Sequence, residues 1–206
     1  DYQVALHSLP FRLGGLRGLE QIDDGYLAPP LDRSPRAREL VDGLQGLKVG
    51  LCWQGNPRAA IDCGRSVPFE KLEPLLDLEL VDFVSLQSRD GLEGLEARVA
   101  ERDNFHCLAG LDDETEAFAE TVVLIDAVDL VITSDTSVAH LAGAMGRECW
   151  VLLQKFPEWR WGLEGAETPW YPNTRLFRQA DRGDWESVTS DVKAAIHDFL
   201  PSLWDV

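Results

Sequence analysis

The sequence predicts an α/β domain in which a mostly parallel, doubly wound sheet is covered by helices on both faces. Two observations support this fold class. Apolar runs of strand length recur along the chain, and segments with the spacing of amphipathic helices lie between them. Strand and helix alternate about six times, and strands joined through helices form parallel sheets that are buried on both faces. We therefore expect a Rossmann-like architecture.

The expected elements follow from local patterns. Residues 47–53 form a short apolar run flanked by glycines, which is typical of a buried strand. Residues 69–78 have helical spacing, and Pro68 suits the first turn of that helix. Acidic residues near the start of 115–128 favour a helix there. Further strands are expected at 80–86, 105–108, 130–133, 149–153 and 176–177, and further helices at 91–102, 136–145 and 185–200.

The first 46 residues differ from the rest because proline and glycine interrupt them repeatedly. Such punctuation predicts a loop-rich segment, with one short helix at 35–44. We expect residues 1–46 to be the tail of a preceding domain plus a linker, and residues 47–206 to form the α/β domain. The chain opens at Asp1 without a methionine, which favours its being part of a longer protein.

The charge balance is strongly acidic. Thirty-six Asp and Glu residues against nineteen Lys and Arg residues give a net charge of −17. This balance argues against general binding of nucleic acids or of anionic membrane surfaces, which both depend on basic residues. No apolar run approaches the roughly 18 residues of a membrane helix. An anionic small molecule would need a locally built site.

The four cysteines are far apart and form no CxxC pair. Cys52, Cys107 and Cys149 lie in apolar segments that we expect to be buried strands, whereas Cys63 lies in a polar loop. This usage favours free, reduced thiols in a cytoplasmic protein.

The loops that follow the strands are the expected place for a ligand, because open α/β sheets bind ligands outside the carboxyl ends of their strands. The strongest local signal is Ser134-Asp135-Thr136-Ser137, which leads from a buried strand into a helix of small residues. Free backbone N–H groups and hydroxyls at such a helix start can hold an anion. The simpler alternative is that Ser134 or Asp135 only caps the helix.

Two further side chains are candidates for the same edge of the sheet. Arg65 could grip two oxygens of a phosphate, or it could be a solvated arginine. His140 could bind a ligand or act as an acid or base, or it could be a packing residue one turn into the helix. The sequence has no dinucleotide-binding glycine motif, no P-loop, no Asp-x-Asp triplet or His/Cys cluster for a metal, and no nucleophile elbow. We therefore expect neither a metal nor a cofactor.

Several segments, in order, resemble one known family. Together they are similar to the C-terminal half of the heptosyltransferase-like family 9 glycosyltransferases, and in particular to versions that follow tetratricopeptide repeats in bacterial proteins. The similarity runs from about residue 3 to residue 200, and its most specific part is the Asp-Thr-Ser-x-x-His-Leu-Ala block that begins at Asp135. The segments are 49–57, 65–68, 83–87, 135–146, 159–161 and 169–172.

The resemblance implies the C-terminal half of a glycosyltransferase B fold. In that family the C-terminal Rossmann-like domain binds a nucleotide-diphosphate sugar, and the N-terminal domain holds the acceptor and the catalytic base. Transfer inverts the anomeric carbon without a metal. Residues 47–206 would then be the donor-binding domain. The base would lie in the N-terminal domain, so this chain would hold no catalytic residue and would not transfer sugar alone.

Site residues are implied position by position. Residues 135–137 would hold the diphosphate and sugar, His140 would support their loop, and Arg65 would bind phosphate in the role that a metal plays elsewhere. Gln54 and Asn56 would line the cleft, and Gln87 would lie near the nucleoside. Lys155 and Glu158 make their loop more charged than in relatives. The implied substrate-binding residues are Gln54, Gly55, Asn56, Arg65, Ser66, Gln87, Asp135, Thr136, Ser137 and His140.

Two other functions remain open. One is a binding or interaction module that keeps the fold without catalysis, because a fold alone does not fix function. The other is an epimerase or hydrolase on the same scaffold. The role of three tryptophans is also open. They could stack on a sugar or base, or pack against an absent half-domain; they are Trp159, Trp161 and Trp170.

Overall fold

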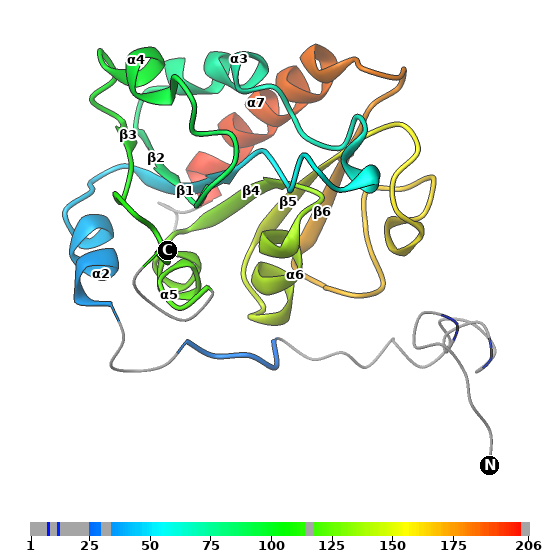
Figure 1. Ribbon diagram of the computed structural model, residues 1–206, viewed down its shortest axis with the longest axis horizontal. Helices are drawn as coiled ribbons and strands as arrows, with labels where there is room; N and C mark the ends of the chain where they lie inside the picture. Colours follow the sequence, from blue (N-terminus) through cyan, green and yellow to red (C-terminus); the bar gives the residue numbers. More distant parts are fainter. Residues whose placement is uncertain (1–7, 9–11, 13–24, 30–33, 114–117, 203–206) are drawn as a thin grey trace.

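A six-stranded parallel sheet is the centre of the molecule, with strand order β3-β2-β1-β4-β5-β6 (Figure 1). The computed structural model describes residues 8, 12, 25–29, 34–113 and 118–202. The expected Rossmann-like fold class is confirmed, and the sheet is parallel throughout. Its strands are β1 (Leu47–Cys52), β2 (Val81–Ser85), β3 (Phe105–His106), β4 (Leu130–Ser134), β5 (Cys149–Leu153) and β6 (Thr174–Arg178).

The strand order reverses beside β1, and this reversal positions the site. From β1 the chain adds β2 and then β3 on one side, and then crosses to place β4 on the other side. Leu51 pairs with Ser85 of β2 and with Ile132 of β4, so β1 is hydrogen-bonded along both edges. The connection from β1 to β2 and the connection from β4 to β5 run in opposite directions along the sheet. This opens a crevice outside the carboxyl ends of β1 and β4.

Helices cover both faces of the sheet (Figure 1). One apolar cluster packs α3 and α7 against the sheet, and a second packs α2, α5 and α6 against the opposite face. The small residues of α6 allow close packing, because the Tyr171 ring occupies the space that a Cβ on Gly143 would need. The helices are α2 (Pro35–Asp42), α3 (Phe69–Leu72), α4 (Leu95–Val99), α5 (Thr121–Ala127), α6 (Ser137–Ala144) and α7 (Trp185–Ser202), with 3₁₀ turns η3 (Ala60–Asp62), η4 (Glu73–Asp77) and η5 (Trp159–Trp161).

Three expected helices are shorter than their sequence patterns. The helix expected over 69–78 divides into α3 and the 3₁₀ turn η4, which contains Pro74 near its start, a residue with no N–H to continue an α-helix. The helix expected over 91–102 is reduced to α4, because Gly91 and Gly94 adopt positive φ angles of 84° and 71°. The helix expected over 115–128 is α5 in the described residues, and residues 114–117 lie outside them.

The segment before β1 contributes to the core. The helix expected over 35–44 is α2, whose Ala37 and Val41 are buried in the same apolar cluster as α5. The backbone N–H groups of Tyr26 and Leu27 both donate to the carbonyl of Ala144 at the end of α6. Most of residues 1–24 lie outside the described part of the chain, and the domain boundary at residue 46 stays a prediction.

All four cysteines are free. Cys52 and Cys149 are buried as expected, but the expectation for Cys107 is wrong. The strand β3 ends at His106, so Cys107 already lies in the exposed loop.

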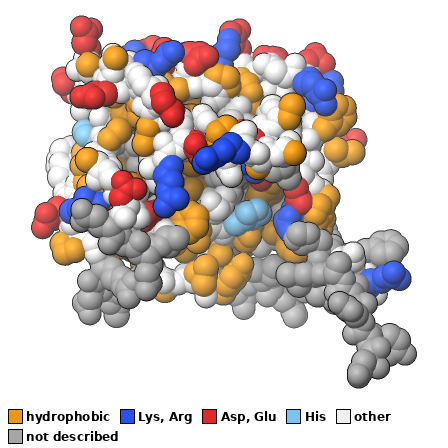
Figure 2. All heavy atoms as spheres, in the orientation of Figure 1, with side chains coloured by type: hydrophobic (Ala, Val, Ile, Leu, Met, Phe, Trp, Pro, Cys, Tyr) orange, Lys and Arg blue, Asp and Glu red, His pale blue; other side chains and the backbone are white. Residues whose placement is uncertain are grey.

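Charged side chains of both signs are spread over the surface. On the face drawn in Figure 2, acidic and basic side chains are mixed along the upper edge, and basic side chains also lie near the centre beside hydrophobic ones. Within the described residues, no helix has the length and apolar character needed to cross a membrane.

Candidate functional site

A pocket of about 350 Å³ opens where the strand order reverses. Its walls come from the loops after β1, β2 and β4 and from the start of α5, so it lies in the crevice at the carboxyl ends of the strands. It is lined by Cys52, Gln54, Gly55, Asn56, Arg65, Leu86, Gln87, Ser88, Arg89, Asp90, Phe118, Thr121, Thr136, Ser137 and Val138.

Most of the predicted site residues meet at this pocket. Ser66, Asp135 and His140 do not line it, although Ser66 accepts from the N–H of the lining residue Gly55. The predicted residues that line the pocket are Gln54, Gly55, Asn56, Arg65, Gln87, Thr136 and Ser137.

Gln87 joins two of the pocket's loops. Its buried side-chain oxygen accepts from the backbone N–H groups of Trp53 (3.2 Å) and Gln54 (3.1 Å), and from the thiol of Cys52 (3.5 Å). Its Nε2 donates to the carbonyls of Gln54 (2.8 Å) and Asp90 (2.7 Å). The amide is therefore fully used by the protein, and Gln87 positions the loop that carries Gln54 and Gly55.

Arg65 is held at the pocket by an acidic partner. Its Nε and Nη2 donate to one Asp62 carboxylate oxygen, at 3.2 Å and 3.1 Å. Ser66 donates to the same oxygen (2.7 Å) and accepts from the N–H of Gly55 (3.1 Å). A Cβ on residue 55 would lie 2.2 Å from Arg65 Nη2, so a glycine there lets the guanidinium lie close to the backbone. Both charged side chains are mostly buried, and Arg65 is thus an oriented cation and not a solvated one.

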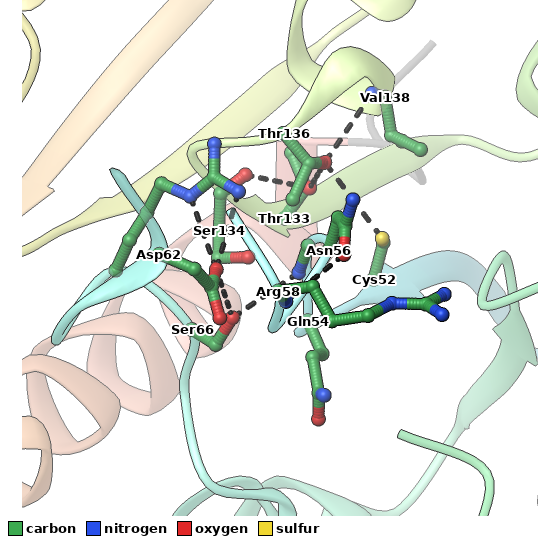
Figure 3. Close-up of polar contacts among 12 residues, drawn as sticks. Cys52, Gln54, Asn56, Arg58, Asp62, Ser66, Thr133, Ser134, Thr136 and Val138 are labelled. Carbon is green, nitrogen blue, oxygen red and sulfur yellow. Dashed lines mark hydrogen bonds and ion pairs between the residues drawn. The ribbon is translucent and has the colours of Figure 1, made fainter. Parts of the chain in front are cut away.

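Thr136 caps α6, whereas the sequence suggested Ser134 or Asp135. Its hydroxyl accepts from the N–H of Val138 (3.3 Å) and lies 3.1 Å from the Thr133 hydroxyl and 3.8 Å from the Cys52 sulfur. Figure 3 shows these contacts together with the separate Asp62–Ser66 contact. Burial raises the pKa of the Cys52 thiol, so this sulfur remains protonated at neutral pH.

Asp135 and His140 lie behind the pocket wall beside Trp161. The His140 ring stacks on the Trp161 indole, with centroids 5.2 Å apart and planes inclined by 12°, and its Nδ1 lies 3.1 Å from the Tyr171 hydroxyl. Burial lowers the pKa of His140 and raises that of Asp135. The positive charge of Arg65 opposes the rise at Asp135. His140 is thus a neutral residue at pH 7 that packs against Trp161 and Tyr171.

Two buried polar atoms on this side lack partners. Ser134 Oγ and Trp161 Nε1 make no hydrogen bond to any described residue. Buried hydroxyl and indole N–H groups are usually bonded, and leaving one unpaired costs about 1–3 kcal/mol. Neither residue lines the pocket, so the helix side carries two desolvated polar atoms behind the pocket lining.

Several residues of the pocket were not predicted from the sequence. Arg89 lies two positions after Gln87, in the same strand-to-helix loop, and this proximity was the available signal. Phe118 and Thr121 come from the start of α5, and no motif marks them. Their position depends on Asp112 and Glu120, which bond across eight residues of sequence.

The three tryptophans have different surroundings. Trp161 is buried against His140, so it packs within this chain. Trp159 is 47% exposed and meets Trp170 edge-on at 5.9 Å. The two charged residues noted in the loop after β5 both form ion pairs: Lys155 with Asp181 (2.9 Å) and Glu158 with Arg160 (2.6 Å). For Trp159, stacking on a ligand and packing against another domain both remain possible roles.

Among the described residues, no three His, Cys, Asp or Glu side chains group in a way that could hold a metal ion.

Comparison with known proteins gives one sequence relative and several structural ones. No protein-family model matches the chain. Protein FlbA of Caulobacter vibrioides is 33% identical over 187 residues, which cover 87% of this chain and 30% of FlbA. The ADP-heptose LPS heptosyltransferase II of E. coli superposes with a TM-score of 0.55 and 20% identity, over 85% of this chain and 54% of that structure. The family 9 glycosyltransferase of Veillonella parvula gives a TM-score of 0.59 and 14% identity, over 81% and 51%.

This chain therefore spans about half the length of the solved structures that it matches, and 30% of FlbA. Identities of 14% and 20% establish the fold alone. The parallel six-stranded sheet of this chain, with helices on both faces, is a Rossmann-like fold that matches family 9 heptosyltransferase structures.

Proposed function

We propose that this chain is the donor-binding half of an inverting, metal-independent glycosyltransferase and binds a nucleotide-diphosphate sugar. One observation carries the proposal. The pocket at the strand reversal gathers an oriented arginine, polar loop side chains and a helix start, in a chain whose net charge is −17. Two arginines, Arg65 and Arg89, line this pocket of an acidic chain, which supports a locally built site for an anion.

The diphosphate would lie between Arg65 and the start of α6. The guanidinium is already fixed by Asp62, and its Nη1 makes no hydrogen bond to a described residue, so this nitrogen can reach an anion. Ser137 is exposed at the first turn of α6, where backbone N–H groups favour negative charge. As the glycosidic bond breaks, charge grows on the leaving diphosphate, and donors fixed there stabilise the transition state more than the ground state.

The rest of the reaction belongs to residues outside this chain. The catalytic base and the acceptor site would lie in an N-terminal domain of a longer, cytoplasmic protein, in which tetratricopeptide repeats could precede both domains. Both solved structures are about twice the length of the matched region, which supports a two-domain enzyme. The isolated chain is then expected to bind a donor without transferring its sugar.

One observation favours the interaction module as the second candidate. Phe156, Trp159 and Leu163 are all exposed within the loop after β5. If that loop docks a partner protein and the pocket binds nothing, the chain is a non-catalytic module. Nucleotide binding distinguishes the two functions.

Calorimetric titration with ADP, UDP, GDP and dTDP tests the proposal, and the relative named for ADP-heptose makes ADP the first choice. We expect saturable binding of at least one nucleotide, weakened about ten- to hundredfold by Arg65→Ala, because charged hydrogen bonds contribute about 1.5–3 kcal/mol. Arg102→Ala is the matched control: Arg102 is also paired with an aspartate, Asp77, but does not line the pocket. Failure to bind any of the four at millimolar concentration would refute donor binding by this chain.

A further inference from the structure

Phe118 is an aromatic side chain on the wall of the pocket. It is 38% exposed and lines the pocket together with Gln87 and Thr121. It comes from the chain just before α5, whereas Arg65 follows β1 and Ser137 begins α6. The pocket thus has an apolar, flat-faced wall contributed by a different segment from its cationic one.

The backbone of Phe118 has an unusual conformation. Its φ angle is +66°, in the left-handed region that large side chains rarely adopt. Leu80 is the other large apolar residue with a positive φ among the described residues, and it lies in the exposed turn before β2, away from the pocket. Strained residues persist only where their surroundings hold them, and they are frequent at ligand sites.

A buried polar cluster holds this conformation in place. Asp112 accepts from the N–H of Glu120 (2.7 Å) and from the hydroxyl of Thr121, and the Glu120 carboxylate accepts from the N–H of Asp112 (2.9 Å). Arg36 of α2 donates twice to Glu120, at 2.6 Å each. The carbonyl of Phe118 accepts from Val122, which ties it to the first turn of α5.

Asp112, Glu120 and Thr121 lie close to Phe118 in the chain, and of the cluster's residues Thr121 alone lines the pocket. The effect of the cluster is to fix where α5 begins, and therefore where the ring before it projects. A ring fixed in this way loses little conformational freedom when a ligand binds.

We propose that Phe118 is the platform on which the nucleobase of the donor stacks, an inference that rests on the proposed function. The ring offers a flat apolar face and no hydrogen-bonding group, which suits a nucleobase face. Ser88, Arg89 and Asp90 line the same pocket and offer polar groups for the edge of a base. Stacking of a base on an aromatic side chain contributes enough to change affinity by roughly five- to 150-fold.

The test compares Phe118→Leu with the unaltered chain for two probes, the tightest-binding nucleoside diphosphate and inorganic pyrophosphate. Leucine keeps an apolar side chain of similar size but has no aromatic face. We expect the nucleoside diphosphate to bind at least fivefold more weakly, the affinity for pyrophosphate to be unchanged, and Phe118→Tyr to retain binding. Equal affinity of Phe118→Leu and the unaltered chain for the nucleoside diphosphate would overturn the platform.

Two glycine variants separate stacking from a structural role. Phe118→Gly and Leu80→Gly each relieve a left-handed backbone, so we expect neither to lower the thermal unfolding midpoint. Only Phe118→Gly should lose nucleoside diphosphate affinity. A lowered unfolding midpoint for Phe118→Gly, with base binding retained, would make the residue structural.

Failure of the proposal is distinguishable from failure of the proposed function. If the unaltered chain binds pyrophosphate as tightly as every nucleoside diphosphate, the base platform is wrong while the anion site stands. If it binds neither probe, both proposals are wrong. If Phe118→Leu weakens only an intact nucleotide sugar and not the nucleoside diphosphate, the ring contacts the sugar and the base platform is overturned.

Discussion

The two sides of the pocket differ in how completely their polar groups are bonded. The loop side is formed by residues 53–66 and 87–90. There Gln87 bonds to the backbone of Trp53 and Gln54, and Ser66 bonds to Asp62 and to the N–H of Gly55. On the helix side, formed by residues 134–140 with Trp161, two buried polar atoms have no partner among the described residues. The loop side is shaped by its own contacts, whereas the helix side leaves two buried polar atoms unpaired behind the pocket lining.

The largest effect should come from the loop side. In Gln87→Leu, the N–H groups of Trp53 and Gln54 and two carbonyls lose their partner at a buried position. We expect the free energy of unfolding to fall by about 3 kcal/mol, as measured by urea denaturation. Gln45→Leu is the control, because the exposed side chain of Gln45 donates one long hydrogen bond, to the carbonyl of Gly43 (3.5 Å). Equal stability of the two variants would show that the loop side does not depend on the Gln87 amide.

The start of α5 should behave like the loop side, but with a pH dependence. The pKa of Glu120 is lowered to about 2, and the largest cause is its hydrogen bond with Arg36. A carboxyl whose pKa is lowered by folding contributes its full stabilisation above its ordinary pKa near 4.5, and that contribution is lost as the pH falls toward 2. We expect Glu120→Gln to lower the free energy of unfolding by about 2 kcal/mol at pH 7 and by less at pH 2.5.

Thermal or urea unfolding at both pH values checks this expectation. Glu73→Gln removes a carboxylate from an exposed ion pair with Arg98, so it should have a much smaller effect. A loss for Glu120→Gln that is the same at pH 7 and pH 2.5 would show that ionisation of Glu120 is not what holds α5 to α2.

The contrast between the two sides also explains what the sequence could predict. Strands β1, β4 and β5 were predictable, because parallel strands are continuous apolar runs. The strand-end loops located the pocket, since the fold class fixes where ligands bind. The use of each side chain was not predictable. Gln87 was expected to lie near the nucleoside; it lines the pocket, but its amide is bonded to backbone groups of its own loop and of the loop after β1.

Long-range partners account for the remaining differences. The Asp112–Glu120 contacts place Phe118 at the pocket, and their effect depends on Arg36 from a helix 84 residues away in the sequence. No local pattern encodes such a contact. The short α3 was locally encoded by Pro74, but the apolar spacing of residues 69–78 suggested a longer helix.

A smaller effect tests the side-chain cap at the start of α6. In Thr136→Val the helix loses its cap to the N–H of Val138 while keeping the shape of the side chain. We expect the free energy of unfolding to fall by about 1 kcal/mol. The matched control is Thr174→Val in β6, because the buried Thr174 hydroxyl has no partner in the described chain. A cost as large for Thr174→Val would mean that burial of the hydroxyl, and not capping, determines the loss.

The smallest effect on stability should come from Ser134→Ala, and this variant tests the comparison most directly. Its buried hydroxyl has no hydrogen-bond partner among the described residues, so removing it abandons no bond and relieves a desolvated polar atom. We expect the free energy of unfolding to stay the same or to rise by less than about 1 kcal/mol. Ser85→Ala is the matched control at the end of β2, because the buried Ser85 hydroxyl accepts from the N–H of Gln87 (3.3 Å), and its loss should be destabilising. If Ser134→Ala proves as destabilising as Ser85→Ala, the two sides of the pocket are equally self-contained. If instead Ser134→Ala preserves stability but weakens nucleotide-sugar binding, the loop after β4 affects the ligand indirectly, because Ser134 is fully buried and does not line the pocket.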